Sequence, residues 1–155
     1  MSAISSELRE WVRPGLAGMV TVVRPDGLPE IARVWGARSA ADPDGLEIDV
    51  QRAAAVGLLA ALDAESRAAV NLIEIPSYRS RTFKGSCRLL PLPPDVALVE
   101  GNVQAVQAAF QSVGMPADAT ERMLSYGGGL NLVTLLITVD SVFDQSPKPG
   151  AGARL

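Results

Sequence analysis

Hydrophobic and polar residues alternate along much of the first half of the chain, which is the pattern of strands with one buried face. The segment GMVTVV (18–23) is rich in β-branched residues and ends near the hairpin signal Asp26-Gly27. The next segment, EIARVWGARS (30–39), alternates throughout, so that Ile31, Arg33, Trp35 and Ala37 share one face. We therefore predict an antiparallel hairpin.

A change of period then predicts a helix. LEIDV (46–50) still alternates, but RAAAVGLLAALDAE (52–65) is rich in alanine, the best helix former, and carries leucines at helical spacing. AAVNLI (68–73) returns to the strand pattern. Before the first strand, residues 6–12 are predicted to form a short helix capped by Ser5 or Ser6.

The second half of the chain adds strands and helices in alternation. FKGSCRLLPL (83–92) and LNLVTLLITVD (130–140) are predicted strands, and GNVQAVQAAFQSVG (101–114) is a predicted helix with one apolar stripe. A short helix should follow Pro116, and the tail SPKPGAGARL is predicted to be a loop or an extended arm. Antiparallel strands with helices at their ends indicate a mostly β, α+β fold with a closed or nearly closed barrel.

Composition places the chain among ordered globular proteins. Its 155 residues are 48% hydrophobic and 20% charged, which suits one domain spanning 1–155 and argues against disorder. The longest apolar stretch (130–139) is shorter than the roughly 20 residues that a membrane helix needs. The amino terminus also lacks the apolar stretch of a signal peptide. A soluble, cytoplasmic protein with no membrane partner is predicted.

The net charge of −3 and a pI near 4.9 argue against nucleic acid as a partner. With no histidine, Ser-His-Asp catalysis and His-ligated zinc are excluded, and one cysteine permits no intrachain disulfide and no thiolate metal cage. Cys87 lies in a predicted strand and is interpreted as a small buried hydrophobe. No metal site is predicted.

Glycine loops and acidic pairs receive structural interpretations. GGG (127–129) lies between a predicted helix and a predicted strand, the opposite order from a dinucleotide fingerprint, and is interpreted as a turn. Glu47 and Asp49 alternate on one strand, which is typical of a solvated face. No residue can be named as a catalytic acid or base.

The segment SYRSRTFKG (77–85) is unusually cationic for an acidic chain. As a strand it would place Tyr78, Ser80, Thr82 and Lys84 on one face and Arg79, Arg81 and Phe83 on the other, and neither face is plain core. These cations, with Arg33, Arg38, Arg52 and Arg88, are either solvating charges on a barrel exterior or a site for a flat anionic ligand. The combination of cation and aromatic on one face, as in Arg33 and Trp35, supports the ligand for part of this set, and the residues alone leave both interpretations open.

Four segments, in this order, resemble the FMN-binding split β-barrel family, the pyridoxamine 5′-phosphate oxidase-like proteins. RPDGLPEIARVWG (24–36) resembles the family's early hairpin, and GLLAALDAESRAAVNLI (57–73) its helix leading into a strand. SYRSRTFKG resembles the family's Tyr-Arg-x-x-x-x-Lys-Gly strand. VFDQSPKPGAGARL (142–155) resembles the Asp-Gln-x-Pro-x-Pro-Gly-Ala-Gly ending of one branch of small members.

The resemblance implies an antiparallel split β-barrel, mostly β with a few short helices, and a homodimer with two FMN sites at the subunit interface. It implies a ring lying against the strand around Val34 and Trp35, and a phosphate held by Arg, Lys, Ser and Thr side chains. The cofactor-binding residues implied in this way are Arg33, Val34, Trp35, Arg52, Arg79, Ser80, Thr82 and Lys84. Hydride transfer between the flavin and a small molecule would be the chemistry.

The sequence departs from the family at one phosphate position. Many members carry a pattern like Arg-Lys-x-x-Asn-Leu where this chain has QRAAAVGLL (51–59), so Arg52 alone would supply charge there. The cofactor is therefore FMN, a deazaflavin or none. Three functions stay open: a flavin-dependent oxidoreductase acting on a small-molecule substrate, a non-catalytic flavin or deazaflavin binding protein, and an apo split-barrel dimer with an interaction role.

Overall fold

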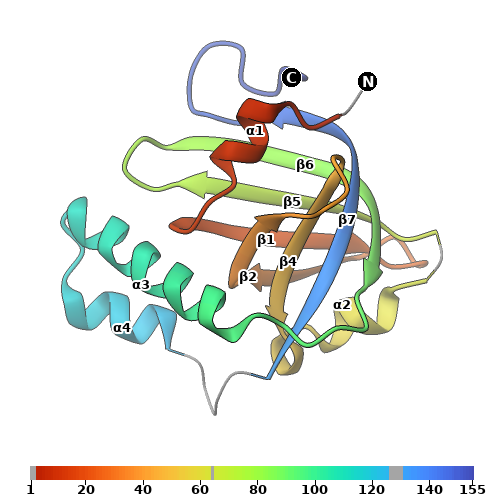
Figure 1. Cartoon of the computed structure of the whole chain (residues 1–155), viewed down its shortest axis with the longest axis horizontal. Coiled ribbons are helices and arrows are strands. Elements are labelled where there is room, and N and C mark those ends of the chain that lie inside the picture. Colours follow the sequence, from red (N-terminus) through yellow and green to blue (C-terminus); the bar gives the residue numbers. More distant parts are fainter. Residues whose placement is uncertain (1–2, 64, 126–130) are drawn as a thin grey trace.

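The computed structural model describes residues 3–63, 65–125 and 131–155. Within these residues the strands form one antiparallel sheet in the order β2-β1-β5-β6-β7-β4-β3, curled into a barrel (Figure 1). The predicted fold class, a mostly β split barrel with a few short helices, is confirmed. The strands are β1 (Leu16–Val23), β2 (Pro29–Val34), β3 (Gly36–Ser39), β4 (Gly45–Gln51), β5 (Arg67–Glu74), β6 (Arg79–Leu89) and β7 (Leu132–Asp144).

Short helices cover the ends and one outer side of the barrel. In Figure 1, α1 lies over one end, α2 lies toward the other, and α3 and α4 run side by side along the outside. No helix in the described ranges combines the length and the hydrophobicity needed to cross a bilayer. The helices are α1 (Ser6–Trp11), the 3₁₀ turn η1 (Arg52–Ala54), α2 (Val56–Ala61), α3 (Val96–Ser112) and α4 (Ala117–Leu124).

The two edge strands of the sheet are consecutive in the chain, and this closes the barrel. β2 pairs with β1 and β3 pairs with β4, so the backbone changes partner at Trp35, whose N–H donates to the carbonyl of Asp49 at 2.8 Å. The single strand predicted over residues 30–39 was therefore wrong. Alternation continues through Trp35, but the pairing does not.

Turn and helix signals in the sequence predicted some of the other element boundaries correctly and others not. The Asp26-Gly27 turn is confirmed, with Gly27 at a φ of 86° and its N–H bonded to the carbonyl of Arg24 at 2.9 Å. The helix predicted over 52–65 is shorter, because Ala55 (φ −111°, ψ 17°) separates η1 from α2 and Leu62 is extended.

The prediction for α3 began too late, whereas the short helix predicted after Pro116 is confirmed as α4. Asp95 caps α3 by accepting a hydrogen bond from Leu98 N–H at 3.0 Å, so the helix starts at Val96 and not at residue 101. α4 ends at Leu124. The predicted GGG turn (127–129) lies outside the described residues.

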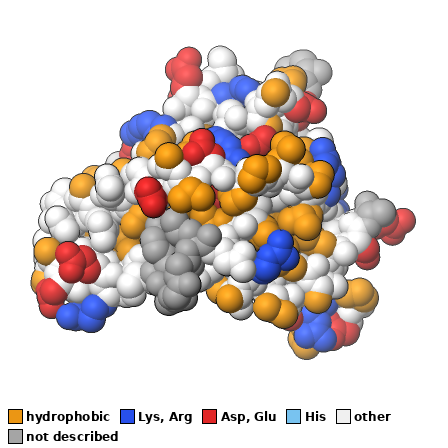
Figure 2. All heavy atoms as spheres, turned by 60° about the horizontal axis from the view of Figure 1, so that its bottom comes forward, with side chains coloured by type: hydrophobic (Ala, Val, Ile, Leu, Met, Phe, Trp, Pro, Cys, Tyr) orange, Lys and Arg blue, Asp and Glu red, His pale blue; other side chains and the backbone are white. Residues whose placement is uncertain are grey.

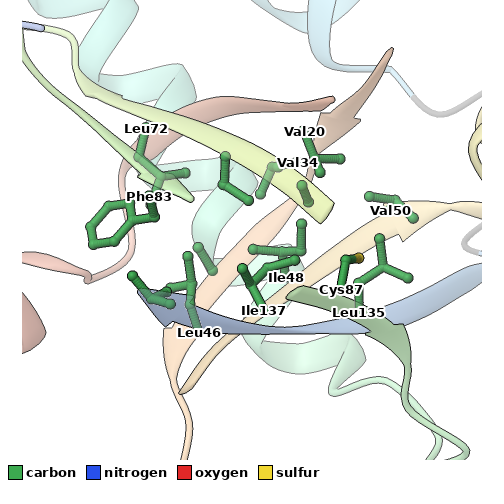
Figure 3. Close-up of a cluster of buried hydrophobic side chains, with 14 of the residues drawn as sticks. Val20, Val34, Leu46, Ile48, Val50, Leu72, Phe83, Cys87, Leu135 and Ile137 are labelled. Atoms are coloured by element: carbon green, nitrogen blue, oxygen red, sulfur yellow. The ribbon is translucent and has the colours of Figure 1, made fainter. Parts of the chain in front are cut away.

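The inner face of the sheet carries the hydrophobic core. Side chains from β1, β4, β5, β6 and β7 meet inside the barrel, and Phe83 and Leu46 have no exposed surface (Figure 3). Trp11 of α1 closes one end, with its ring stacked 6.4 Å from that of Phe83. Cys87 is part of this core, as the sequence predicted.

A bulge between β6 and β7 is fixed by one glycine. The pairing shifts between Lys84, which faces Ser141, and Gly85, which faces Val139. A Cβ at position 85 would lie only 1.9 Å from the carbonyl oxygen of Thr138. Only glycine fits there, and the extra residue lets both Val139 and Val142 be buried despite their odd spacing.

The carboxyl-terminal tail folds back onto the end of β7 and is not an extended arm. The N–H of Gly152 donates to the carbonyl of Asp144 at 2.6 Å, and the N–H of Asp144 donates to the carbonyl of Ala153 at 2.9 Å. Gly150 and Gly152 both have a φ of 88°, which this tight return requires.

Candidate functional site

The structure explains the cationic segment 77–85 by giving its two faces different roles. Phe83 on the inner face is fully buried core, and Arg81 ends that face opposite Asp144. The inference that neither face is core was therefore wrong for the inner one. Thr82 and Lys84 lie on the outer face, where polar groups can meet a ligand.

A row of four side chains, three of them polar, crosses the outer face of four neighbouring strands and is called the polar row below. Met19 on β1 lies directly opposite Arg33 on β2 and, on its other side, opposite Asn71 on β5. Asn71 in turn lies opposite Thr82 on β6. Residues opposite each other in a sheet share a face, so these four side chains form one row. Lys84 begins the adjacent row, opposite Ala69.

Asn71 links the polar side chains of β6. Its amide nitrogen donates to Ser80 Oγ at 3.1 Å and to Thr82 Oγ1 at 3.0 Å. Sequence reasoning missed Asn71, although a lone polar residue in the run AAVNLI was a usable signal. Ser80 is buried and also receives a tail contact, since its N–H donates to Ser146 Oγ at 3.1 Å.

The cations predicted for the site differ in their partners. Arg79 lies at the tip of the β5–β6 hairpin, exposed, and pairs with Glu74 at 3.2 Å. No carboxylate pairs with Arg33, Arg52 or Lys84 anywhere in residues 3–63, 65–125 and 131–155. The structure therefore leaves three of the four predicted cations available to an anion.

Two of these cations lie over aromatic rings. The guanidinium of Arg33 lies 5.2 Å from the ring centroid of Trp35, and its Nη1 donates to the carbonyl of Met123 at 2.7 Å. Lys84 is exposed, with Nζ 4.7 Å from the ring of Phe143. The pairing of Arg33 with Trp35 was predicted, whereas the aromatic under Lys84 comes from β7.

A cavity of about 220 Å³ opens beside the polar row, between the sheet and helices α3 and α4. Arg33, Val34, Trp35 and Asn71 contribute to its walls from the sheet side. The helix side is apolar apart from Asn102 of α3. Its lining residues there include Val103, Val106, Phe110, Met123 and Leu124.

Solved structures of this architecture supply the comparison. The chain matches HupZ of Group A Streptococcus with a TM-score of 0.52 and 15% identity over 97% of this chain and 98% of that one. It matches a putative pyridoxamine 5′-phosphate oxidase from Lactobacillus delbrueckii with a TM-score of 0.54 and 13% identity, covering 92% and 95% of the two chains. General stress protein 26 from Bacillus anthracis matches with a TM-score of 0.50 and 15% identity over 96% and 97%.

This chain has the split β-barrel fold of the pyridoxamine 5′-phosphate oxidase-like proteins. The resemblance read from the sequence is thus confirmed for the fold. No protein-family model matches the sequence, and no curated protein is significantly similar to it.

Within this split barrel, Arg52 stands apart from the cavity. It is exposed at the start of η1, its N–H donates to the carbonyl of Asn131 at 2.8 Å, and it does not line the cavity. The cavity is not lined by any of the predicted residues of β6, which are Arg79, Ser80, Thr82 and Lys84. Asn71 lines the cavity and donates to Thr82, so it connects β6 to the cavity.

One acidic residue of the split barrel behaves differently from its prediction. Asp49 has no exposed surface, although alternation with Glu47 suggested a solvated face. Its carboxylate lies 2.6 Å from Arg38 Nη1 and accepts a 2.6 Å hydrogen bond from Thr134. α3 covers this part of the outer face, with Val99 over Gly36, so the acid is part of the helix-sheet packing and not a proton donor open to a substrate.

Proposed function

We propose that this protein binds FMN, or a deazaflavin in its place, on the outer face of β1, β2, β5 and β6, and acts as a flavin-dependent oxidoreductase on a small molecule. The observation that carries the proposal is the polar row from Arg33 to Thr82, bordered by cations that lack carboxylate partners in the described residues. The similar fold of a putative pyridoxamine 5′-phosphate oxidase supports it.

The donors on this face suit the phosphate of such a cofactor. Lys84 is exposed and uncompensated, and Thr82 beside it offers a hydroxyl donor. Arg52 is the second cation in the proposal; it lies beside Asn131, at the opposite end of β7 from the Ser141 that faces Lys84, so it would join the phosphate across the interface of the proposed homodimer. Ser80 is buried, so its role would be to hold Asn71, and Arg79 is already neutralised by Glu74. The proposed ligand set therefore narrows to Lys84, Thr82 and Arg52 for the phosphate.

The surface around the row suits a flat ring and a second subunit. Met19, Ile31 and Val23 point outward from the same sheet face and are 45%, 53% and 59% exposed. Figure 2 shows hydrophobic side chains in the centre and right half of one side of the molecule, with cationic side chains among and beside them. Such surface is unusual for a monomer, and we propose that the ring, lying against the outer face of β1 and β2 beside the cavity, and a homodimer partner cover it.

The chemistry would come from the bound flavin, which supplies hydride and electron transfer. The protein would fix the ring on the sheet, exclude water with its apolar surface and offer hydrogen-bond donors. The backbone carbonyl of Asp49 accepts a hydrogen bond from Trp35 N–H, and its buried carboxylate is held by Arg38 and Thr134. Protons would therefore move between the substrate and the flavin, without a base from the described residues.

Titration of purified protein with FMN, followed by flavin fluorescence, tests the site. Lys84→Ala and Arg52→Ala should each weaken FMN binding about tenfold, the size expected for one charge-assisted phosphate contact. Arg88→Ala is the matched control, since Arg88 is an exposed arginine on the same strand as Lys84. Unchanged FMN affinity in both site variants would show that the site is assigned wrongly.

A further inference from the structure

We infer that the cavity between the sheet and helices α3 and α4 binds the substrate of the proposed reaction, and that this substrate is a flat, largely apolar molecule carrying a carboxylate. The substrate role rests on the proposed function, but binding of such a molecule does not. Its volume of about 220 Å³ exceeds the roughly 150 Å³ that admits benzene to an apolar protein cavity. One or two fused rings are therefore the scale of ligand that fits.

Because the walls of the cavity are mostly apolar, we expect the body of its ligand to be apolar as well. Ala17, Met19 and Ile73 contribute from the sheet, and Val106 and Phe110 from α3. Figure 1 shows α3 and α4 lying along the outside of the barrel, where they cover this part of the sheet. A polar ligand would lose hydration here without recovering hydrogen bonds, so the cavity selects against it.

Arg33 supplies the one charge among the described lining residues. Its guanidinium is held over Trp35, at 5.2 Å, and by the carbonyl of Met123, at 2.7 Å. That hydrogen bond uses one of five N–H donors, and no carboxylate of the described residues pairs with this arginine. A cation fixed at the wall of an apolar cavity is best satisfied by a carboxylate, which can accept two parallel hydrogen bonds.

The other polar residues of the lining are already engaged. Asn102 donates to the carbonyl of Trp35 at 2.8 Å and accepts from Gly15 N–H at 2.8 Å, so its amide ties α3 to the sheet. The amide nitrogen of Asn71 serves Ser80 and Thr82. The recognition element of the cavity is therefore Arg33.

Isothermal titration calorimetry with 2-naphthoate and its neutral counterpart 2-naphthalenemethanol tests the inference. We expect one naphthoate per chain, bound at least tenfold more tightly than the alcohol. Arg33→Met should bring naphthoate to the affinity of the alcohol, whereas Arg88→Met should change nothing. Ala17→Leu, which fills the cavity from β1, should abolish binding of both compounds, and circular dichroism checks that each variant is folded.

Parallel FMN titrations separate this inference from the proposed function. Arg33-dependent naphthoate binding without FMN uptake would support the cavity and contradict the flavin proposal. FMN uptake with no naphthoate binding, or with naphthoate binding indifferent to Arg33→Met, would overturn the cavity inference alone. Competition between naphthoate and FMN would also overturn it, because the cavity would then be the ring site itself.

Discussion

Arg81 and Asp144 face each other directly across β6 and β7, with Arg81 Nη1 2.7 Å from Asp144 Oδ1. The guanidinium also lies 5.7 Å from the ring of Trp11, so the pair closes the barrel end that α1 covers. Asp144 further accepts from Ser146 N–H at 2.9 Å and pairs with Lys148 at 2.9 Å. One carboxylate thus joins the barrel end to the folded-back tail.

Asp144→Asn should lower the free energy of unfolding at pH 7 by about 3 kcal/mol, because it leaves the half-buried Arg81 without its counter-charge. Urea denaturation measures this difference. A loss below about 0.5 kcal/mol would show that the pair does not hold the barrel end.

The same residue predicts a pH dependence. Hydrogen bonds from Lys148 and Ser146, with the charge of Arg81, hold the pKa of Asp144 well below its ordinary value of 3.8. A depressed carboxylate pKa stabilises the fold above the unfolded-state pKa, and that contribution is lost as pH falls further. The stability gap between wild type and Asp144→Asn should therefore be full at pH 7 and shrink steadily below about pH 4. A gap independent of pH would contradict this account.

Gly85→Ala should cost several kcal/mol of stability, at least about 3 kcal/mol, because its methyl group would overlap the backbone of Thr138. Gly101→Ala is the matched control. Gly101 lies in α3, and a methyl group added there would have no neighbour within 4 Å, so alanine should stabilise the protein by about 0.5–1 kcal/mol. Thermal unfolding of the two variants should shift in opposite directions, and equal shifts would contradict the bulge geometry.

Arg38→Met should destabilise the protein by about 3 kcal/mol, since it leaves the fully buried carboxylate of Asp49 without its cation, and Thr134 is its remaining side-chain partner among the described residues. Arg122→Met removes a pair of 2.9 Å, but Arg122 and Asp118 are 72% and 69% exposed, so its effect should stay within about 0.5 kcal/mol. Chemical denaturation of both variants measures the contrast. Similar losses would mean that burial does not set the value of these pairs.

Burial raises the pKa of the Cys87 thiol to about 12, so the native thiol should be almost unreactive at pH 8. Ellman's reagent should modify it only at the rate of unfolding, and should titrate one thiol per chain at once in denaturant. Fast modification of the folded protein would show that β6 opens readily at this position.

Features set by local residues were predictable from the sequence. The Asp26-Gly27 turn, the Ser5 cap of α1 and the buried strand around Leu135 each depend on a few neighbouring positions. The break at Trp35 and the bulge at Gly85 depend on which strand lies alongside, and alternation carries no such information.

The candidate site divides in the same way. The outer-face placement of Arg33, Thr82 and Lys84 follows from alternation within a strand. Whether a cation is free depends on partners elsewhere in the fold. Only the structure shows that Arg79 forms an ion pair with Glu74 and that Arg81 forms one with Asp144. The burial of Asp49 escaped sequence reasoning for the same reason, because α3 covers it from a distant part of the chain.

Equilibrium titration of the purified protein with FMN, with the absorption spectrum recorded before and after, tests the central claim most directly. We predict saturable uptake of one FMN per chain and a bound-flavin spectrum, with Lys84→Ala weakening the uptake. A protein that stays colourless and takes up no FMN at saturating concentration would contradict the flavin proposal.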